Sequence, residues 1–306
     1  MSAQPPPVDM FSAGRPTVAT SLEKSSKMRR FSWFHRWGHS GNVELIVGGV
    51  IVGLIVLVVI CAPLLTPYGP TDQDLMNALA QPSWAHPLGT DNLGRDTWSR
   101  LVYGGRADLG ISFIAVLVPL IFGSIVGAVC GYFGGWFDMV VMRVGDVVAA
   151  FPFFVLVITL VFVLGSGTMS VFIAISVVSW VAYARIVRAE TMIIRKREFI
   201  DACKTGGLST ARIVLRHVIP NTVTQGVVFA MSDIVLTIGT IVTLSYFGLG
   251  IVPPTPDWGQ MMSDGQQFIA SGNYILTLAP GLVVVFTSLG LSFLGDGIAN
   301  LLRSKQ

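Results

Sequence analysis

The segment LIVGGVIVGLIVLVVICAPLL, residues 45–65, carries no charged side chain, and none occurs anywhere between Glu44 and Asp72. A helix needs about 20 mostly apolar residues to cross about 30 Å of hydrocarbon, so this segment is long enough for one membrane span. The whole chain has 52% hydrophobic and 12% charged residues and a mean hydropathy of +0.69. That composition excludes an ordinary water-soluble domain. The sequence therefore predicts an all-α polytopic membrane protein.

Other uncharged stretches indicate further spans. The 38 uncharged residues at 147–184 are too many for one helix of normal tilt, and Gly165-Ser166-Gly167 offers a turn between two helices. An even number of spans places both ends of the chain on the same side of the membrane. We expect six spans, at about 43–65, 107–131, 140–163, 168–187, 222–247 and 274–297.

The distribution of Lys and Arg predicts the orientation of the spans. Of these 20 residues, 17 lie before the first span, in the 132–143 turn, between residues 185 and 216, or after the last span. Only Arg95, Arg100 and Arg106 fall on the other side, and basic loops stay cytoplasmic. Both termini are therefore expected to be cytoplasmic. Residues 1–40 are polar, basic and proline-containing, which favours a disordered cytoplasmic tail over a secretory signal peptide.

Cys61, Cys130 and Cys203 fall at the outer end of the first span, at the inner end of the second and in a cytoplasmic loop. They are too far apart to pair, so no disulfide is expected.

The loop expected outside at 66–106 contains HPLGTDNLGRDTWSRLVYGGR, residues 86–106. Its turn-forming, charged and aromatic residues fit either an ordered surface loop or a docking surface. The string DNLGRD lacks the alternating oxygen ligands and the final Glu of a calcium loop, so we exclude calcium.

The second outside loop, 248–273, contains GLGIVPPTPDWGQMMSDGQQFI. Its prolines predict a stiff extended segment. Trp258 with Met261 and Met262 forms an apolar anchor, which fits either the lipid interface or contact with an outside partner or with substrate at the pore mouth.

Two cytoplasmic loops carry further patterns. In the 131–146 turn, Asp138 and Arg143 are expected to satisfy each other or neighbouring helix ends. The stretch DACKTGGLSTARIVLRHVIP, 201–220, predicts a helix, an elbow at Gly206-Gly207, and a second short helix capped by Ser209 or Thr210 and stopped by Pro220. Such a segment can rest on lipid headgroups or dock into a groove of another protein. Nucleic-acid binding is disfavoured, since no aromatic residues are interleaved with the basic ones.

This stretch resembles the loop signature of permease subunits of binding-protein-dependent ABC importers: E-A-A, three residues, G, nine residues, I-x-L-P. Here Asp201-Ala202-Cys203 is followed after three residues by Gly207 and after nine more by His217-Val218-Ile219-Pro220. HPLGTDNLGRDTWSRLVYGGR, GYFGGWFD with MRVGD, PPTPDWGQMMSDG and FLGDG extend the resemblance over about 260 residues, to the dipeptide, oligopeptide and nickel permease family. Within that family the chain is most similar to the second permease of a dipeptide-type importer.

The resemblance implies a pore-forming subunit with the type I ABC importer permease fold in a bacterial inner membrane, not an enzyme, and without catalytic residues, metal or cofactor of its own. The implied partners are a second permease, two ATP-binding subunits that carry ATP and Mg, a periplasmic or extracellular substrate-binding protein, and the bilayer. No G-x-x-x-x-G-K-[ST] occurs in the sequence, so energy must come from another chain. ATPase coupling is assigned to the 188–220 loop, at Asp201, Ala202, Cys203, Gly206, Gly207, Arg212, Ile219 and Pro220. Contact with the binding protein, or the gate, is assigned to Gly89, Thr90, Asp91, Gly94, Arg95, Asp96, Pro254, Asp257 and Trp258.

Peptides are the expected substrate, and nickel or glutathione import by the same architecture stays open. A self-sufficient secondary transporter is less favoured, because residues 43–163 and 168–300 show no repeat. An intramembrane aspartyl protease would pair Asp233 with Asp146 or Asp296, but their expected depths differ. We expect Asp233 instead to have a hydrogen-bonded structural role at the interface with the second permease. The histidines, at 35, 39, 86 and 217, are too scattered to bind a metal together.

Overall fold

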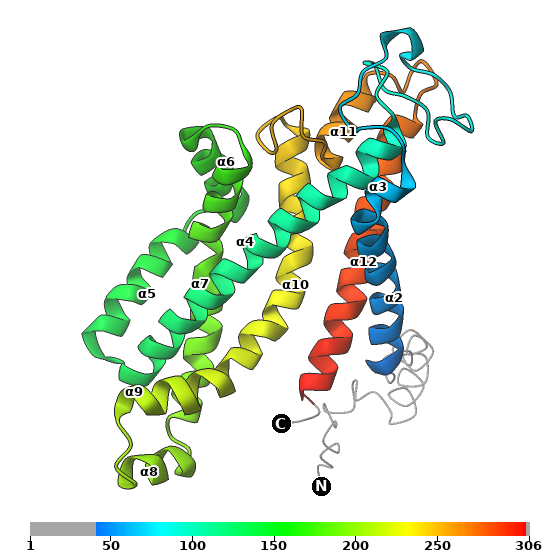
Figure 1. The fold of residues 1–306 in the computed structure, drawn as a ribbon. Coiled ribbons are helices and arrows are strands. Elements are labelled where there is room, and N and C mark those ends of the chain that lie inside the picture. The colour runs from blue at the N-terminus through cyan, green and yellow to red at the C-terminus, as the bar shows by residue number, and fades with distance from the viewer. Residues whose placement is uncertain (1–40, 304–306) are drawn as a thin grey trace, which may run out of the picture. The chain divides into compact units, whose positions relative to one another are not determined.

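A computed structural model describes residues 41–303. The predicted tail at 1–40, which includes His35 and His39, lies outside the described residues. Within the described range the regular elements are all helices, and the one strand-like pairing is an isolated bridge between Thr90 and Asp96 (Figure 1). Five of these helices are long and apolar enough to cross a membrane, and a bent pair would make a sixth span. The all-α membrane fold is therefore confirmed.

The described helices are, in chain order, α2 (Gly41–Ile60), α3 (Ala62–Leu65), η2 (Leu75–Asn77), α4 (Thr97–Phe133), α5 (Gly135–Ala149), α6 (Phe153–Leu164), α7 (Thr168–Ile194), α8 (Glu198–Thr205), α9 (Thr210–Ile213), η3 (Val214–Val218), α10 (Ile219–Tyr246), α11 (Trp258–Gln266) and α12 (Ile275–Arg303).

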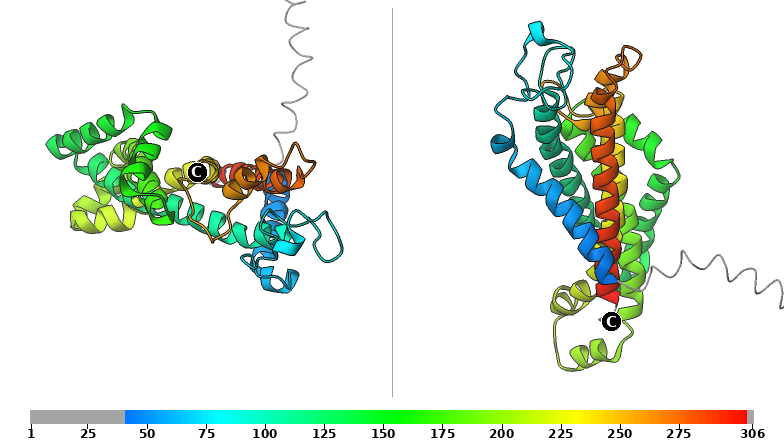
Figure 2. Two further views of the ribbon diagram at one scale, coloured as in Figure 1. Left: turned by 90° about the horizontal axis from the view of Figure 1, so that it is seen from above. Right: turned by 90° about the vertical axis from the view of Figure 1, so that its right-hand side faces the viewer.

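Helices α2 and α12, the first and last long helices of the described range, pack together at their lower ends and diverge toward the upper end (Figure 2). A Cβ atom added to Gly48 would lie 2.2 Å from the backbone nitrogen of Leu294, and one added to Gly297 would lie 2.7 Å from the Cα of Leu45. Only glycine permits these approaches. Small residues let helices pack closely in lipid, where burial of apolar area gives little driving force.

Helices α4 and α7 are joined through glycines spaced four residues apart. Cβ atoms added to Gly123, Gly127 and Gly131 would lie 2.6, 2.4 and 2.7 Å from backbone oxygens of α7. Because residues four apart share one helix face, these glycines form a continuous stripe on which α7 rests. The pair α4–α7 is the centre against which α10 also packs.

The third predicted span, 140–163, differs from the structure. Helices α5 and α6 replace it and meet at 88°. The break falls just before Pro152, which precedes the first residue of α6. Proline disfavours helical geometry in the residue before it, so the helix ends there. Asp138 of α5 accepts two hydrogen bonds of 2.5 Å from the Arg188 guanidinium of α7, while Arg143 lies 3.5 Å from Asp146 instead of pairing with Asp138.

The expected stop at Pro220 is wrong. Helices α9, η3 and α10 form one continuous helical run over residues 210–246. Proline lacks the N–H donor and its ring crowds the carbonyl one turn earlier, which normally breaks a helix. Here η3 is a π-helical turn, in which the N–H of Ile219 reaches back five residues to the oxygen of Val214. This wider turn lets the chain pass Pro220 without ending.

The two ends of the long helices carry different elements. In Figure 1, α8 and α9 lie at the lower end, and α3, α11 and the loops around them lie at the upper end. The loops 66–96 and 248–274, far apart in sequence, therefore meet at one end. The two candidate sites assigned from the sequence occupy opposite ends of the helices.

Candidate functional sites

The segment at the lower end begins with α8, an eight-residue helix with favourable charges at both ends. Glu198 and Asp201 lie in its first turn and Lys204 in its last, which matches the helix dipole. Lys204 also pairs with Asp201 at 2.9 Å. Gly207 then takes a φ of +76°, a left-handed conformation that favours glycine, and the N–H of Leu208 reaches back to the oxygen of Cys203. The predicted elbow is present, although Ser209 precedes α9 without a side-chain capping bond.

One face of this segment is buried against the membrane helices. Ile194, Ile200, Ile213 and Val218 form an apolar cluster, and Tyr132 at the end of α4 packs against it. The guanidinium of Arg195 also donates to the oxygens of Gly131 and Tyr132, at 3.0 and 3.1 Å, and so caps the C-terminus of α4. The segment is therefore fixed to α4, α7 and η3.

Most of the residues assigned to coupling lie on the exposed surface of the segment, while Cys203 packs against the apolar cluster. Cys203 and Ile219 are half-buried, and the others are exposed: Asp201, Ala202, Gly206, Gly207, Arg212 and Pro220. A Cβ atom added to Gly207 would meet no atom within 4 Å. Six of the eight assigned residues are thus exposed, and the small residues Ala202, Gly206 and Gly207 follow one another within six positions of the chain.

The second assigned set lies at the upper end and is mostly buried. The Asp91 carboxylate accepts from the backbone N–H groups of Leu93 and Arg95, and both Arg95 and Arg100 donate to it from their side chains. The Arg95 and Arg100 guanidinium groups lie 3.7 and 3.6 Å from Asp264 of α11. We call this cluster of Asp91, Arg95, Arg100 and Asp264 the outer junction. It fastens the first outside loop to the second.

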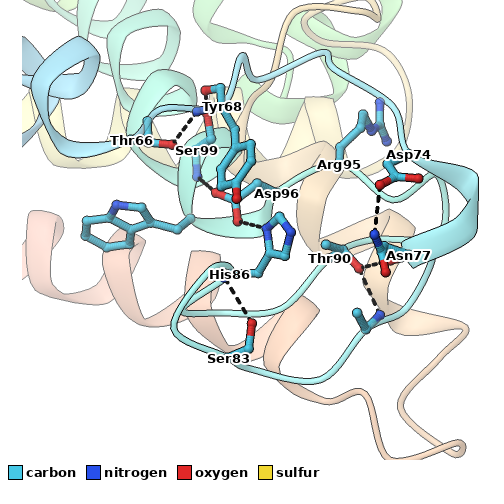
Figure 3. A network of polar contacts seen from close by, with 12 residues as sticks. Thr66, Tyr68, Asp74, Asn77, Ser83, His86, Thr90, Arg95, Asp96 and Ser99 are labelled. Atoms are coloured by element: carbon cyan, nitrogen blue, oxygen red, sulfur yellow. Dashed lines mark hydrogen bonds and ion pairs between the residues drawn. The ribbon is translucent and has the colours of Figure 1, made fainter.

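A second network orders the same loop (Figure 3). Asp96 caps α4 by accepting from the N–H of Ser99 at 2.7 Å, and its other oxygen lies 2.9 Å from Nδ1 of His86. Thr90 donates to the oxygen of Asn77 and accepts from the N–H of Ala80. These side chains are therefore occupied within the loop.

Most of the residues assigned to outside contact or to the gate are buried in the structure, and their contact role stays a prediction. Of the nine residues assigned outside, Pro254 is exposed, while the other eight are buried: Gly89, Thr90, Asp91, Gly94, Arg95, Asp96, Asp257 and Trp258. Their polar groups and glycines build the turns of the loops, which is why they looked functional in the sequence. The exposed apolar side chains of the first loop are Leu75, Met76 and Trp84.

Trp258 lies neither at a lipid interface nor on an outer surface. It is fully buried with Leu101 and Met261, and its indole N–H donates to the oxygen of Leu101 at 2.9 Å. Its backbone N–H donates to the carboxylate of Asp108 at 2.9 Å. Trp258 therefore anchors α11 to α4.

Asp257 precedes Trp258 and caps α11 through the N–H of Gln260. Its side chain is fully buried, and burial raises the pKa of this carboxyl group. One oxygen of Asp257 and one of Asp108 have no hydrogen-bond partner in the described part of the chain. This buried acid pair is a structural feature that the sequence pattern did not reveal.

A cavity of about 550 Å³ lies between α6, α7 and α10. Asp233 of α10 lines it, and the hydroxyl of Tyr183 from α7 donates to Asp233 at 2.7 Å. Asp233 therefore has a hydrogen-bond donor within its own chain. Its expected place at the interface with a second permease stays a prediction. Asp146 is instead exposed beside Arg185, and Asp296 lines a different cavity with Glu44. The three acids do not converge, so the pairs needed for an aspartyl protease are not formed.

Comparison with known proteins identifies the family. Residues 123–306 match the family described as "Binding-protein-dependent transport system inner membrane component", and residues 45–82 match the "N-terminal TM domain of oligopeptide transport permease C". The chain belongs to this permease family.

Two relatives match the permease over nearly its whole length. The dipeptide transport system permease protein DppC of Alkalihalophilus pseudofirmus is 36% identical over 99% of this chain and 94% of the relative. The glutathione transport system permease protein GsiD of Pectobacterium atrosepticum is 35% identical over 94% of this chain and 96% of the relative. These matches confirm the family inferred from the sequence motifs.

A solved structure supports the fold. An inward-facing conformation of the MetNI methionine ABC transporter aligns with a TM-score of 0.52 at 19% identity, covering 67% of the permease and 96% of that chain. The helical arrangement is therefore that of an ABC importer permease.

Besides the buried acid pair, sequence reasoning missed two further features of the permease. The glycines at 123, 127 and 131 have the small-x-x-x-small spacing of a helix-packing face, a signal that was present in the sequence. The Tyr183–Asp233 bond joins residues 50 positions apart, and no local pattern indicates it.

Proposed function

We propose that this permease forms half of the pore of an ATP-driven importer for peptides, with dipeptides as the first candidates. The other half is a second permease subunit. Two ATP-binding subunits bind ATP and Mg, and a substrate-binding protein delivers the peptide. The permease therefore needs no cofactor, resident metal or catalytic residue of its own. The observation that carries the proposal is 36% identity to a dipeptide permease over 99% of the chain.

The coupling segment, residues 188–220, provides the link to the ATP-binding subunits. Its exposed face of small residues suits a close fit into a cleft of another protein, and its buried face is packed against Tyr132 and η3. Because residues 210–246 form one helical run, displacement of α9 is carried along that run to α10, and the elbow at Gly206-Gly207 joins α8 to α9. The segment therefore acts as a lever between an ATP-driven partner and the helices that line the pore.

The proposed location is a bacterial inner membrane, with both termini and the coupling segment in the cytoplasm. The positions of Lys and Arg support this orientation, since 17 of 20 fall in the segments expected on the side of the coupling segment. The α11 end then faces outward, toward the binding protein. Because the outer junction is buried, the exposed side chains of Met76 and Trp84 are better candidates for that contact.

Glutathione is the second candidate substrate, because a glutathione permease is 35% identical over 94% of this chain. Glutathione is itself a short peptide, so the same pore chemistry would serve both. Nickel remains an alternative suggested by the motifs alone.

The test is ATP-driven uptake by the complete importer in proteoliposomes. The permease is purified with its second permease and ATP-binding subunits, and labelled dipeptide or glutathione is supplied with the binding protein. We expect uptake that requires ATP and all of the partner chains. Uptake by this chain alone without ATP would refute the proposal and favour a secondary transporter.

A further inference from the structure

The cavity between α6, α7 and α10 has one ionisable residue in its wall. Asp233 is that residue, and the remaining lining side chains are apolar or carry a hydroxyl group. Of the lining threonines, Thr240 and Thr243 donate to backbone oxygens of their own helix, at 2.8 and 2.6 Å. The carboxylate is therefore the strongest polar group that faces this space.

Tyr183 hydrogen-bonds to the Asp233 carboxylate from outside the cavity. The tyrosine is fully buried and does not line the cavity, and its hydroxyl donates to Oδ2 of Asp233 at 2.7 Å. Its ring packs edge-on against Phe229, with centroids 5.0 Å apart, and its Cβ lies close to Gly123 of α4. Among residues 41–303, the second oxygen of Asp233 has no hydrogen-bond donor, so it remains available to a ligand in the cavity.

We propose that Asp233 receives the α-ammonium group of a peptide during its passage, with Tyr183 as the positioning residue. This inference rests on the proposed function. Every unmodified peptide with a free amino terminus carries this cation for much of the time at neutral pH, whatever its side chains are. A single carboxylate in a mostly apolar wall would recognise the α-ammonium group that all such peptides share and would select little among their side chains. A metal ion would need several ligands, and one carboxylate does not supply them.

The cavity size agrees with this occupant. Small-molecule sites measure about 300–1,000 Å³ and combine apolar walls with a few placed polar groups. At about 550 Å³, this cavity has room for a dipeptide. An ionisable group within a membrane-spanning helix is costly and is retained mainly where it pairs or faces a substrate path. A helix of the second permease filling the cavity is the competing explanation.

The first experiment measures the charge that the cavity presents and needs no transport. Gly239 lines the cavity, and a Cβ atom there would meet no atom within 4 Å, so Gly239→Cys introduces a thiol without a clash. Gly110→Cys of α4 is a control for reagent access, because its Cβ position is equally open but lies in a different cavity, beside Arg106. Both are made in the complete importer after the native cysteines at 61, 130 and 203 are replaced.

The readout is the rate of modification by cationic and by anionic methanethiosulfonate reagents. We expect the cationic reagent to react about tenfold faster than the anionic one at residue 239, because a carboxylate nearby attracts the cation and repels the anion. Asp233→Asn should abolish this preference. An unchanged preference in Asp233→Asn, or a residue 239 protected from both reagents by a neighbouring subunit, would overturn the inference.

The second experiment measures uptake with the same peptide and binding protein in every arm, so that selection by the binding protein cancels. Asp233→Asn should lower kcat/KM for a neutral dipeptide about tenfold, the loss expected for a charge-assisted hydrogen bond. Asp233→Glu should restore part of it, and Tyr183→Phe should raise KM by a smaller factor. Stimulation of ATPase activity by the binding protein should persist, because the coupling segment is unchanged.

The two proposals can fail separately. If Asp233→Asn transports the peptide with unchanged kcat/KM, the inference is wrong while the peptide importer stands. If the unmodified importer moves no peptide but residue 239 shows the cation preference, the proposed substrate is wrong while cation recognition by Asp233 stands.

Discussion

Gly207→Arg is expected to disconnect the permease from its ATP-binding partners while leaving it folded. Gly207 has a φ of +76°, and a side chain there would meet no atom within 4 Å. The substitution therefore costs only backbone strain, about 1–2 kcal/mol for a residue with a Cβ in the left-handed region. Such a cost lowers Tm by a few degrees. The Arg side chain, in contrast, projects from the face that is proposed to enter the partner's cleft.

Two further variants separate strain from bulk. Gly207→Ala carries the same strain with one methyl group, and Gly207→Asn has less strain because asparagine tolerates the left-handed region. We expect Ala and Asn to retain most ATPase activity stimulated by the binding protein, and Arg to lose nearly all of it together with copurification of the ATP-binding subunits. Thermal unfolding in detergent should place all three within a few degrees of the unmodified permease.

The result that refutes this reasoning is near-normal peptide uptake by Gly207→Arg. Equal loss of coupling in the Ala and Arg variants would also count against it, because strain in the elbow and not bulk at a docking face would then be the cause.

Three other predictions follow from the packing. Gly127→Leu should prevent stable packing of α4 against α7, since a Cβ there would lie 2.4 Å from a backbone oxygen of α7. Gly110→Leu should be tolerated, because its Cβ position is open. The yield of folded permease in size-exclusion chromatography compares the two variants. Trp258→Ala should cost about 3–5 kcal/mol of stability, while the fully exposed Trp84→Ala should leave Tm unchanged and weaken association with the binding protein; equal Tm values for the two would contradict the burial argument. Burial raises the pKa of Asp257 in the folded state. The stability of the fold should therefore fall as pH rises from the ordinary carboxyl pKa to this raised pKa, because the buried group must then ionise. Asp257→Asn keeps the capping acceptor, so the Tm of the unmodified permease should fall relative to this variant over that interval, and parallel curves would refute the assignment.

The fold and the family were accessible from sequence because their signals are local. Uncharged stretches of about 20 residues identify membrane helices without knowledge of their neighbours. The spacing from Asp201 through Gly207 to Pro220 likewise lies within one short segment. Such patterns could not predict the 88° bend between α5 and α6 before Pro152. A proline in an apolar stretch can either kink a helix or end it.

The two loops show why the burial of the second set of assigned residues could not be predicted from sequence. Asp91, Arg95 and Asp96 are charged and lie among turn-forming residues, a pattern shared by docking surfaces and by internally bonded loops. Asp91 pairs with Arg100 of α4, and Asp96 lies beside His86 of the same loop. Arg95 lies beside Asp264 of α11, which is more than 160 positions away. Pairing over that separation removes the charges from the surface, and only the three-dimensional structure reveals it.

The π-helical turn at Val214–Val218 also sets the phase between two parts of the permease. Such a turn holds one residue more than an α-helical turn, and each residue of an α-helix advances the chain by about 100°. The wider turn absorbs this extra residue within about one revolution, so α9 and α10 stay close to the phase of a single helix. We expect removal of the residue to restore an α-helical turn, in which the Pro220 ring crowds the carbonyl one turn earlier, and so to bend the run between α9 and α10.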